Sequence, residues 1–172
     1  PQDTIDVNGL VPSPSKAKNQ DEKNYIIKAL EYMKLEPEKP ILGTPIDVAF
    51  IGSCTNSRLS DLRSAAHIVK GRKIAKKVIG WVVPGSSKVK KQAEAEGIDR
   101  IFQNAGFQWR ESGCSMCVSL GGDSFPPNCR SISSTNRNFE NRQGIGVKTH
   151  LASPAMVAAA AISGKIVDVS KQ

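Results

Sequence analysis

Two short, almost wholly apolar runs place the strongest constraint on how this chain folds. The first, Ile46–Ile51, lies between Pro45 and Gly52, and the second, Val78–Val83, ends at Pro84. Runs of this length are typical of strands that are covered on both faces, as in a parallel sheet. The sequence therefore predicts at least two buried parallel strands.

Segments in which apolar residues recur at helical spacing alternate with these runs. The last of them opens with Ser153 as N-cap and Pro154 at the first helical position, and Gly164 closes it. We predict helices over Glu22–Leu35, Ser60–Val69, Ser87–Ala95, Ile98–Ala105 and Ala155–Ile162, and further short strands over Gly106–Arg110 and Arg130–Ser133.

Alternating strands, loops and helices predict an α/β fold with a parallel sheet. Residues 1 to about 24 mix proline, serine and charged residues, which predicts an irregular segment. We therefore divide the chain into residues 1–40, an irregular lead-in plus one helix, and residues 41–172, the α/β domain. Functional residues of parallel sheets lie in loops at the carboxyl ends of the strands.

Composition narrows the class of protein. The chain has 172 residues, of which 39% are hydrophobic and 5% aromatic, enough for one core built from aliphatic side chains. The longest apolar run, Ala155–Ile162, falls far short of the ~20 residues that a membrane-spanning helix needs. The first 25 residues hold no apolar stretch of the kind found in signal peptides.

Net charge is +8, and the excess is concentrated in one stretch without acidic residues. Such a cluster is typical of a solvated surface, and its positive charge could also steer an anionic substrate toward the protein. No base-stacking aromatic residues interleave with it, so nucleic-acid binding is not favoured. The basic residues of the stretch are Lys70, Arg72, Lys73, Lys76, Lys77, Lys88, Lys90 and Lys91.

Cysteines occupy two of the loops that follow candidate strands. Cys54 follows the first apolar run, and Cys114 and Cys117 form a Cys-x-x-Cys pair. The pair alone is compatible with a redox dithiol, half a zinc site or two ligands of an iron–sulfur cluster. Three cysteines from two loops would suit a four-iron cluster in which one iron lacks a protein ligand and can act as a Lewis acid. Buried, inert thiols are the alternative for the isolated Cys54 and Cys129.

Three motifs together resemble the aconitase superfamily and, within it, the large subunits of isopropylmalate dehydratases. They are Gly-Ser-Cys-Thr-Asn-Ser at 52–57, Gly-Cys-Ser-Met-Cys at 113–117 and Asn-Arg-Asn-Phe-Glu-Asn-Arg-Gln-Gly at 136–144. The resemblance runs from about residue 25 to the end, and it implies a three-layer, doubly wound fold of the aconitase type. Asn141 stands where the family usually has glycine. Because asparagine tolerates left-handed backbone conformations, we expect the turn to be retained.

The resemblance also implies roles for individual residues. Cys54, Cys114 and Cys117 match the three ligands of a 4Fe-4S cluster. Arg137 and Arg142 match arginines that contact substrate carboxylates, a task that suits the planar fork of a guanidinium. Asn136 and Asn138 would orient the loop or contact substrate and cluster. Three further residues are expected to lie outside the chemistry: Cys129, His67 and His150.

The activity implied by the resemblance is the conversion of 2-isopropylmalate into 3-isopropylmalate by a hydro-lyase of leucine biosynthesis. The implied partners are a small swivelling subunit, upstream large-subunit domains and a small dicarboxylate substrate. A reducing compartment is implied, the cytoplasm or an organelle matrix. This chain alone is expected to be catalytically incomplete, and its motifs identify no catalytic base. Aconitase, homoaconitase, a cluster-free nucleic-acid-binding protein and an assembly module are the alternatives.

Overall fold

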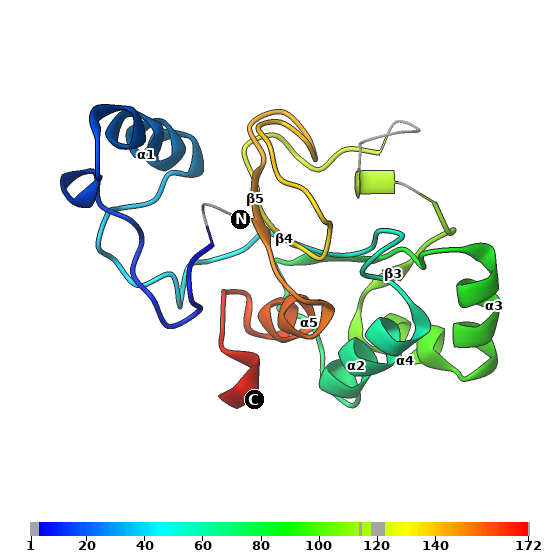
Figure 1. Cartoon of the computed structure of the whole chain (residues 1–172). Coiled ribbons are helices and arrows are strands. Elements are labelled where there is room, and N and C mark those ends of the chain that lie inside the picture. Colours follow the sequence, from blue (N-terminus) through cyan, green and yellow to red (C-terminus); the bar gives the residue numbers. More distant parts are fainter. Residues whose placement is uncertain (1–3, 114, 118–122, 172) are drawn as a thin grey trace.

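A parallel five-stranded sheet forms the centre of the computed structural model, which describes residues 4–113, 115–117 and 123–171 and, of Cys117, only the backbone. The strand order is β3-β2-β1-β4-β5 (Figure 1), and all four pairings are parallel. The strands are β1 (Val48–Ile51), β2 (Ile79–Val82), β3 (Gln108–Trp109), β4 (Arg130–Ser133) and β5 (Lys148–Leu151). The predicted α/β class with a parallel sheet is confirmed.

Helices α2, α4 and α5 lie on one face of the sheet, below it in Figure 1. Among the described residues, the opposite face of the sheet is covered by loop segments and a 3-10 turn. The helices are α1 (Gln20–Met33), α2 (Leu59–Val69), α3 (Ser87–Ala95), α4 (Ile98–Ala105) and α5 (Pro154–Ser163), and the 3-10 turns are η1 (Pro14–Lys16), η2 (Ser115–Cys117) and η3 (Val169–Lys171). All five predicted helices are present.

The differences from prediction have local causes. Helix α1 begins at Gln20 rather than at Glu22, because the side chain of Asn19 accepts a hydrogen bond from the Glu22 amide at 2.8 Å and caps the first turn. Strand β5 was not predicted. It lies at the edge of the sheet, and its polar residues Lys148 and His150 hide it from a search for apolar runs.

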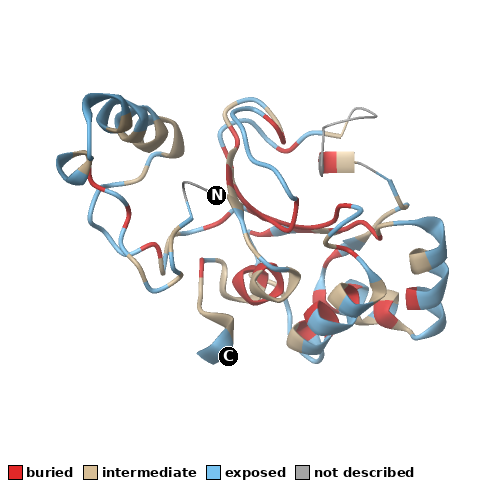
Figure 2. Ribbon diagram, in the orientation of Figure 1, coloured by how far each residue is buried: buried red, intermediate tan, exposed pale blue. Residues whose placement is uncertain are grey.

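The two faces of the sheet bury different cores, because successive residues of a strand point to opposite sides. Ala49 and Ile51 of β1 pack with the apolar sides of α2 and α5. Val48 and Phe50 face the loop-covered side, where they join a second cluster that includes Met116 and Phe125. Figure 2 shows this burial along the strands, whereas α1 carries only exposed and intermediate residues.

The strand order reverses direction between β1 and β4. From β1 the chain adds β2 and then β3 on one side, whereas β4 and β5 lie on the other side. Connections that leave in opposite directions open a crevice outside the carboxyl ends of the two strands at the reversal, where ligands of parallel α/β folds bind. In this chain the loops at the reversal are residues 52–58 after β1 and residues 134–147 after β4.

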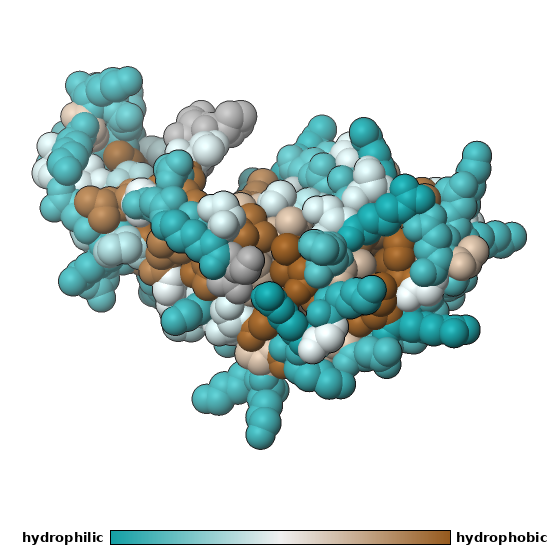
Figure 3. Space-filling view, turned by 90° about the horizontal axis from the view of Figure 1, so that it is seen from below, coloured by the Kyte–Doolittle hydropathy of each residue, from teal (hydrophilic) through white to brown (hydrophobic). Residues whose placement is uncertain are grey.

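The basic stretch is divided along the chain by strand β2. Lys70 to Lys77 precede β2, whereas Lys88, Lys90 and Lys91 lie on α3, which follows β2. The strand therefore separates the two groups, and Lys90 is paired with Glu94 and Glu111. On the side that carries α2, α4 and α5, hydrophilic side chains alternate with apolar areas (Figure 3). Within the described residues, no helix has the length and apolar character that crossing a membrane requires.

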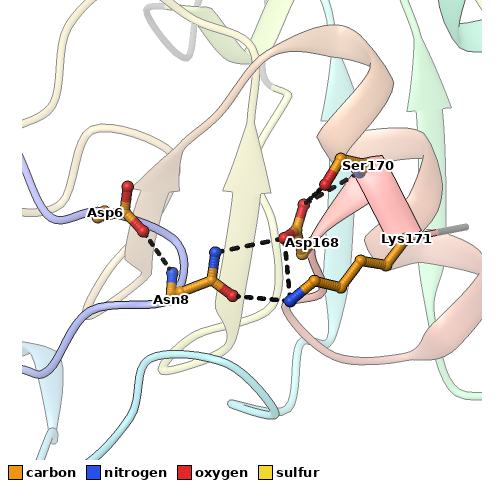
Figure 4. Close-up of polar contacts among 5 residues, drawn as sticks. All are labelled: Asp6, Asn8, Asp168, Ser170 and Lys171. Carbon is orange, nitrogen blue, oxygen red and sulfur yellow. Dashed lines mark hydrogen bonds and ion pairs between the residues drawn. The ribbon is translucent and has the colours of Figure 1, made fainter.

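A polar cluster joins the two ends of the described chain (Figure 4). Asp168 accepts hydrogen bonds from the Asn8 side chain at 3.3 Å and from the hydroxyl of Ser170 at 2.7 Å. The hydrogen bonds from the Ser170 hydroxyl and amide, then the hydrogen bond from Asn8 and the charge of Lys171, lower the pKa of Asp168 to about 2. The carboxylate thus stays ionised and holds the segment before η1 against the segment after α5.

Candidate active site at the β1–β4 reversal

The first cysteine loop, residues 52–58, turns sharply at the end of β1. Gly52 lies over the Phe50 ring, and a Cβ there would lie 2.4 Å from Phe50 Cζ, so only glycine fits. Ser53 is buried with φ +104, and its hydroxyl accepts hydrogen bonds from the amides of Thr55 and Asn56, both at 3.3 Å. This turn leaves the free thiol of Cys54 exposed at the surface.

Ser134 fastens this loop to the end of β4. Its hydroxyl donates to the Gly52 carbonyl at 2.9 Å and accepts from the Gly52 amide at 3.0 Å. Asn56 Nδ2 in turn donates to the Ser134 carbonyl at 2.8 Å. The loops that follow β1 and β4 therefore form one hydrogen-bonded unit.

A second set of contacts ties the first cysteine loop to the end of β2. The hydroxyl of Ser57 donates to the Val83 carbonyl at 2.8 Å, and the Gly85 amide donates to the Ser57 carbonyl at 3.0 Å. A Cβ at Gly85 would lie 3.0 Å from that carbonyl oxygen. The Pro-Gly-Ser segment after β2 thus supports the loop from its other side.

The second cysteine motif is anchored by residues between its two cysteines and by residues on either side of them. Met116 of η2 is fully buried in the second core, and the Ser115 hydroxyl donates to Asp123 at 2.7 Å. Arg110 donates to the other carboxylate oxygen of Asp123 at 2.7 Å, and its guanidinium lies 3.8 Å from the Trp81 ring centroid. Cys114 lies outside the described residues, as does the side chain of Cys117.

Gln143 connects the second cysteine motif with the sheet. It is fully buried, and its Oε1 accepts from the hydroxyls of Ser131 at 2.9 Å and Thr149 at 3.1 Å. Its Nε2 donates to the Ser133 hydroxyl at 3.1 Å and to the Met116 carbonyl at 3.4 Å. One amide group therefore joins β4, β5 and η2 beneath the reversal.

The predicted substrate residues lie on the arginine loop, residues 134–147. Asn136 and Arg137 are exposed, whereas Arg142 is only 5% exposed, with its guanidinium 5.3 Å from the Phe139 ring centroid. Asn138 Nδ2 donates to the Thr149 carbonyl and so orients the loop. The loop thus has one arginine in solvent and one within the protein.

Asn141 shapes the turn of the arginine loop. Its φ of +63 is left-handed, and its side-chain oxygen accepts from the Gly146 amide at 2.7 Å. The expectation that asparagine retains this turn is confirmed.

Comparison with known proteins identifies the family. Residues 1–164 match the model of the aconitase family (aconitate hydratase). The chain belongs to the aconitase family. Membership of this family implies in general the use of an iron–sulfur cluster.

Three relatives within the family are named 3-isopropylmalate dehydratase large subunits. The sequence from Cupriavidus necator is 57% identical over 168 residues, which cover 98% of this chain and 63% of the relative. Large subunit 1 from Bradyrhizobium diazoefficiens is 56% identical over 169 residues, and the relative from Roseiflexus castenholzii is 53% identical over 167. Those two matches cover 98% and 97% of this chain but only 35% of each relative.

The described residues supply few donors for an iron–sulfur cofactor of the family. Within the described part of the chain, no three His, Cys, Asp or Glu side chains converge as metal ligands. That part contains only one of the three predicted ligands, the exposed thiol of Cys54. The thiol is of the right chemical type, and Gln143 and Ser134 connect its loop to the backbone of η2. The one described donor, a free thiol, therefore suits the cofactor.

The other candidate groups lie away from the reversal. Cys129 is buried before β4, and burial raises the pKa of its thiol to about 11, which suits an inert side chain. His67 is exposed on the outer side of α2. Burial, and then the charge of Arg130, lowers the pKa of His150 to about 3, so this imidazole is neutral and accepts a hydrogen bond from Arg130 at 2.9 Å.

Several residues that shape the site had no predicted role. Gln143 lies within the motif at 136–144, and Ser134 lies just before it. Their partners are separated from them in sequence, so only the fold reveals these contacts. Arg110 and Asp123 flank the second cysteine motif. The signal that could have found them is a pair of opposite charges on either side of a glycine-rich and cysteine-rich loop.

Proposed function

We propose that this chain is the cluster-bearing portion of a 3-isopropylmalate dehydratase large subunit. The complete enzyme would be a hydro-lyase that isomerises 2-isopropylmalate to 3-isopropylmalate in leucine biosynthesis. The observation that carries the proposal is the junction at the β1–β4 reversal. There Ser134 and Gln143 join the loop of Cys54, the turn of Cys117 and the loop that bears Arg137 and Arg142.

Cys54, Cys114 and Cys117 would hold a 4Fe-4S cluster. Such a cluster, when bound, supplies a Lewis acid for a substrate hydroxyl, because three thiolates leave one of four irons without a protein ligand. Ser53 and Ser134 fix the backbone around Cys54, so that the thiol is held in position before any metal binds. This preorganisation is what a site built from two distant loops requires.

Arg137 and Arg142 would bind the carboxylates of the substrate. Arg137 is exposed and can pair with an incoming carboxylate through two parallel hydrogen bonds. Arg142 lies within the protein, where weaker screening by water strengthens its attraction for an anion. Asn136, beside Arg137, would add a hydrogen bond to the same substrate.

The proposal includes partners and a compartment. The three relatives are named large subunits, so we expect a small subunit to complete the site together with the remaining large-subunit segments. An oxygen-sensitive cluster and free thiols suit the cytoplasm, or an organelle matrix in a eukaryote.

Anaerobic reconstitution with iron and sulfide tests the proposal. We expect about four iron and four sulfide ions per chain. The variant Cys54→Ser should lose most of both, whereas the matched control Cys129→Ala should retain them, because that thiol is buried before β4. Uptake that is equal in the wild type and in Cys54→Ser would contradict the assignment of Cys54.

The substrate is tested in the enzyme assembled with its small subunit and the remaining large-subunit segments. Turnover of 2-isopropylmalate well above that of citrate and homocitrate is expected. Preference for citrate or homocitrate would instead identify aconitase or homoaconitase activity. Arg137→Lys should raise the KM for the dicarboxylate, because an ammonium group cannot form the paired hydrogen bonds of a guanidinium.

A further inference from the structure

Helix α1 reaches the sheet and its loops at its last turn. None of its fourteen residues is buried, and it stands at the side of the sheet in Figures 1 and 2. Its apolar contacts with the main core come from the half-buried Leu30. An ordinary surface helix buries a continuous apolar stripe, so a helix without one depends more heavily on individual polar contacts.

Two successive residues in the last turn of α1, Tyr32 and Met33, make polar contacts with the rest of the protein. The Tyr32 hydroxyl donates to the Val147 carbonyl at 2.9 Å and accepts from the Asn141 amide at 2.8 Å. The carbonyl of the next residue, Met33, accepts from the guanidinium of Arg130 in β4 at 2.7 Å. The sheet thus fixes the end of α1, and the end of α1 reaches the arginine loop.

The hydroxyl of Tyr32 bridges the two arms of that loop. Asn141 lies just before Arg142, and Val147 is the last residue before β5. Between them Asn141 also accepts from the Gly146 amide, so three hydrogen bonds close this turn. A phenol that both donates and accepts can serve the two backbone groups at once.

We propose that Tyr32 is a positioning residue for the arginine loop and that α1 is therefore part of the active-site architecture. Tyr32 sets the course of residues 141–147 and through them the place of Arg142. The positioning of the backbone is independent of the reaction, whereas its consequence for substrate binding rests on the proposed function. No motif singled out Tyr32, since its partners lie 109 and 115 residues further along the chain.

Amide hydrogen–deuterium exchange on this chain tests the positioning directly. Tyr32→Phe removes one oxygen and keeps the ring, and it should speed exchange of the amides of residues 136–147 by about fivefold or more, the effect of losing about one hydrogen bond. The control Tyr25→Phe removes a hydroxyl group from the same helix, at a residue that is 43% exposed. It should leave amide exchange in residues 136–147 unchanged. Equal exchange in the wild type and Tyr32→Phe would overturn the proposal.

Steady-state kinetics of the assembled enzyme separate this proposal from the proposed function. With Tyr32→Phe, the KM for 2-isopropylmalate should rise about threefold to tenfold, because substrate-binding geometry is disturbed. Iron content should stay close to wild type, and the melting temperature should fall by only a few degrees. A fall in melting temperature without a change in KM would show a merely structural residue and overturn the inference. Faster loop exchange in a protein without dehydratase activity would support the positioning and contradict the proposed function.

Discussion

The hydroxyl of Ser134 lies between the amide and the carbonyl of Gly52 and bonds to both, at 3.0 and 2.9 Å. These residues end neighbouring parallel strands, 82 positions apart in the sequence. Gly52 lacks a Cβ, and this lets the loop lie on the Phe50 ring. Together with the hydrogen bond from Asn56 to the Ser134 carbonyl, this hydroxyl holds the first cysteine loop against the arginine loop.

Replacing Ser134 with alanine should open this junction. The residue is fully buried, so the variant leaves two backbone groups of Gly52 without this partner and should lower the free energy of unfolding by about 1–3 kcal/mol. Urea denaturation measures the change. Ser64→Ala, at an exposed position of α2, is the control and should change it by about 0.5 kcal/mol or less. A Ser134 variant as stable as this control would argue against the junction.

Gly52→Ala should be destabilising for a steric reason. The new methyl group would lie 2.4 Å from Cζ of the fully buried Phe50, so the ring must shift within a packed core, at a cost of about 1–3 kcal/mol. Gly113→Ala is the matched control, since within the described residues no atom beyond the chain neighbours of Gly113 lies within 4 Å of a Cβ built there. Thermal unfolding should separate the two variants by several degrees, and coincident transitions would refute the close approach.

Gln143→Met should disconnect the second cysteine motif from the sheet. Methionine fills a similar volume but leaves the hydroxyls of Ser131 and Thr149 without their acceptor, at a cost of about 2 kcal/mol or more. We expect a lower melting temperature and reduced iron uptake. Gln143→Glu keeps the acceptor for both hydroxyls and should lose less stability at a pH where the carboxyl is protonated. Unchanged iron uptake in a destabilised Gln143→Met would show that the amide supports the sheet alone.

His150 should make stability depend on pH. Its pKa is about 3 in the folded chain against an ordinary value of 6.5, so between these values the unfolded chain binds a proton that the folded chain does not. The neutral imidazole therefore makes its full contribution to the free energy of unfolding above about pH 6.5. Below that pH the free energy of unfolding falls by up to about 1.4 kcal/mol per pH unit.

Denaturant unfolding at pH 7 and pH 5 measures this dependence in the wild type and in His150→Gln. A glutamine can accept the hydrogen bond from Arg130 without titrating, so the variant should lose less stability on acidification. Identical pH dependence of the two proteins would mean that His150 is not the group responsible.

Prediction from sequence succeeded where the signal is local. The runs around β1 and β2 are almost wholly apolar, and each contains the observed strand, which is shorter than the run. Helices α3 and α4 carry helical spacing between clear stops, and their predicted bounds agree with the structure. The edge strand β5 was missed because half-exposed residues at an edge need not be apolar. The motifs located the loops of the candidate site, but they said nothing of the Tyr32, Arg110 or Asp123 contacts that hold those loops.

The sequence by itself determined the α/β class, the helices, the family and the residue types available for chemistry. Each of these depends on spacing along the chain or on short motifs. Only the tertiary structure decided that β4 pairs with β1, that Ser134 meets Gly52 and that the end of α1 reaches the arginine loop. Such contacts join residues about 80 to 115 positions apart, and they form because burying the sheet brings polar groups together that must then satisfy one another.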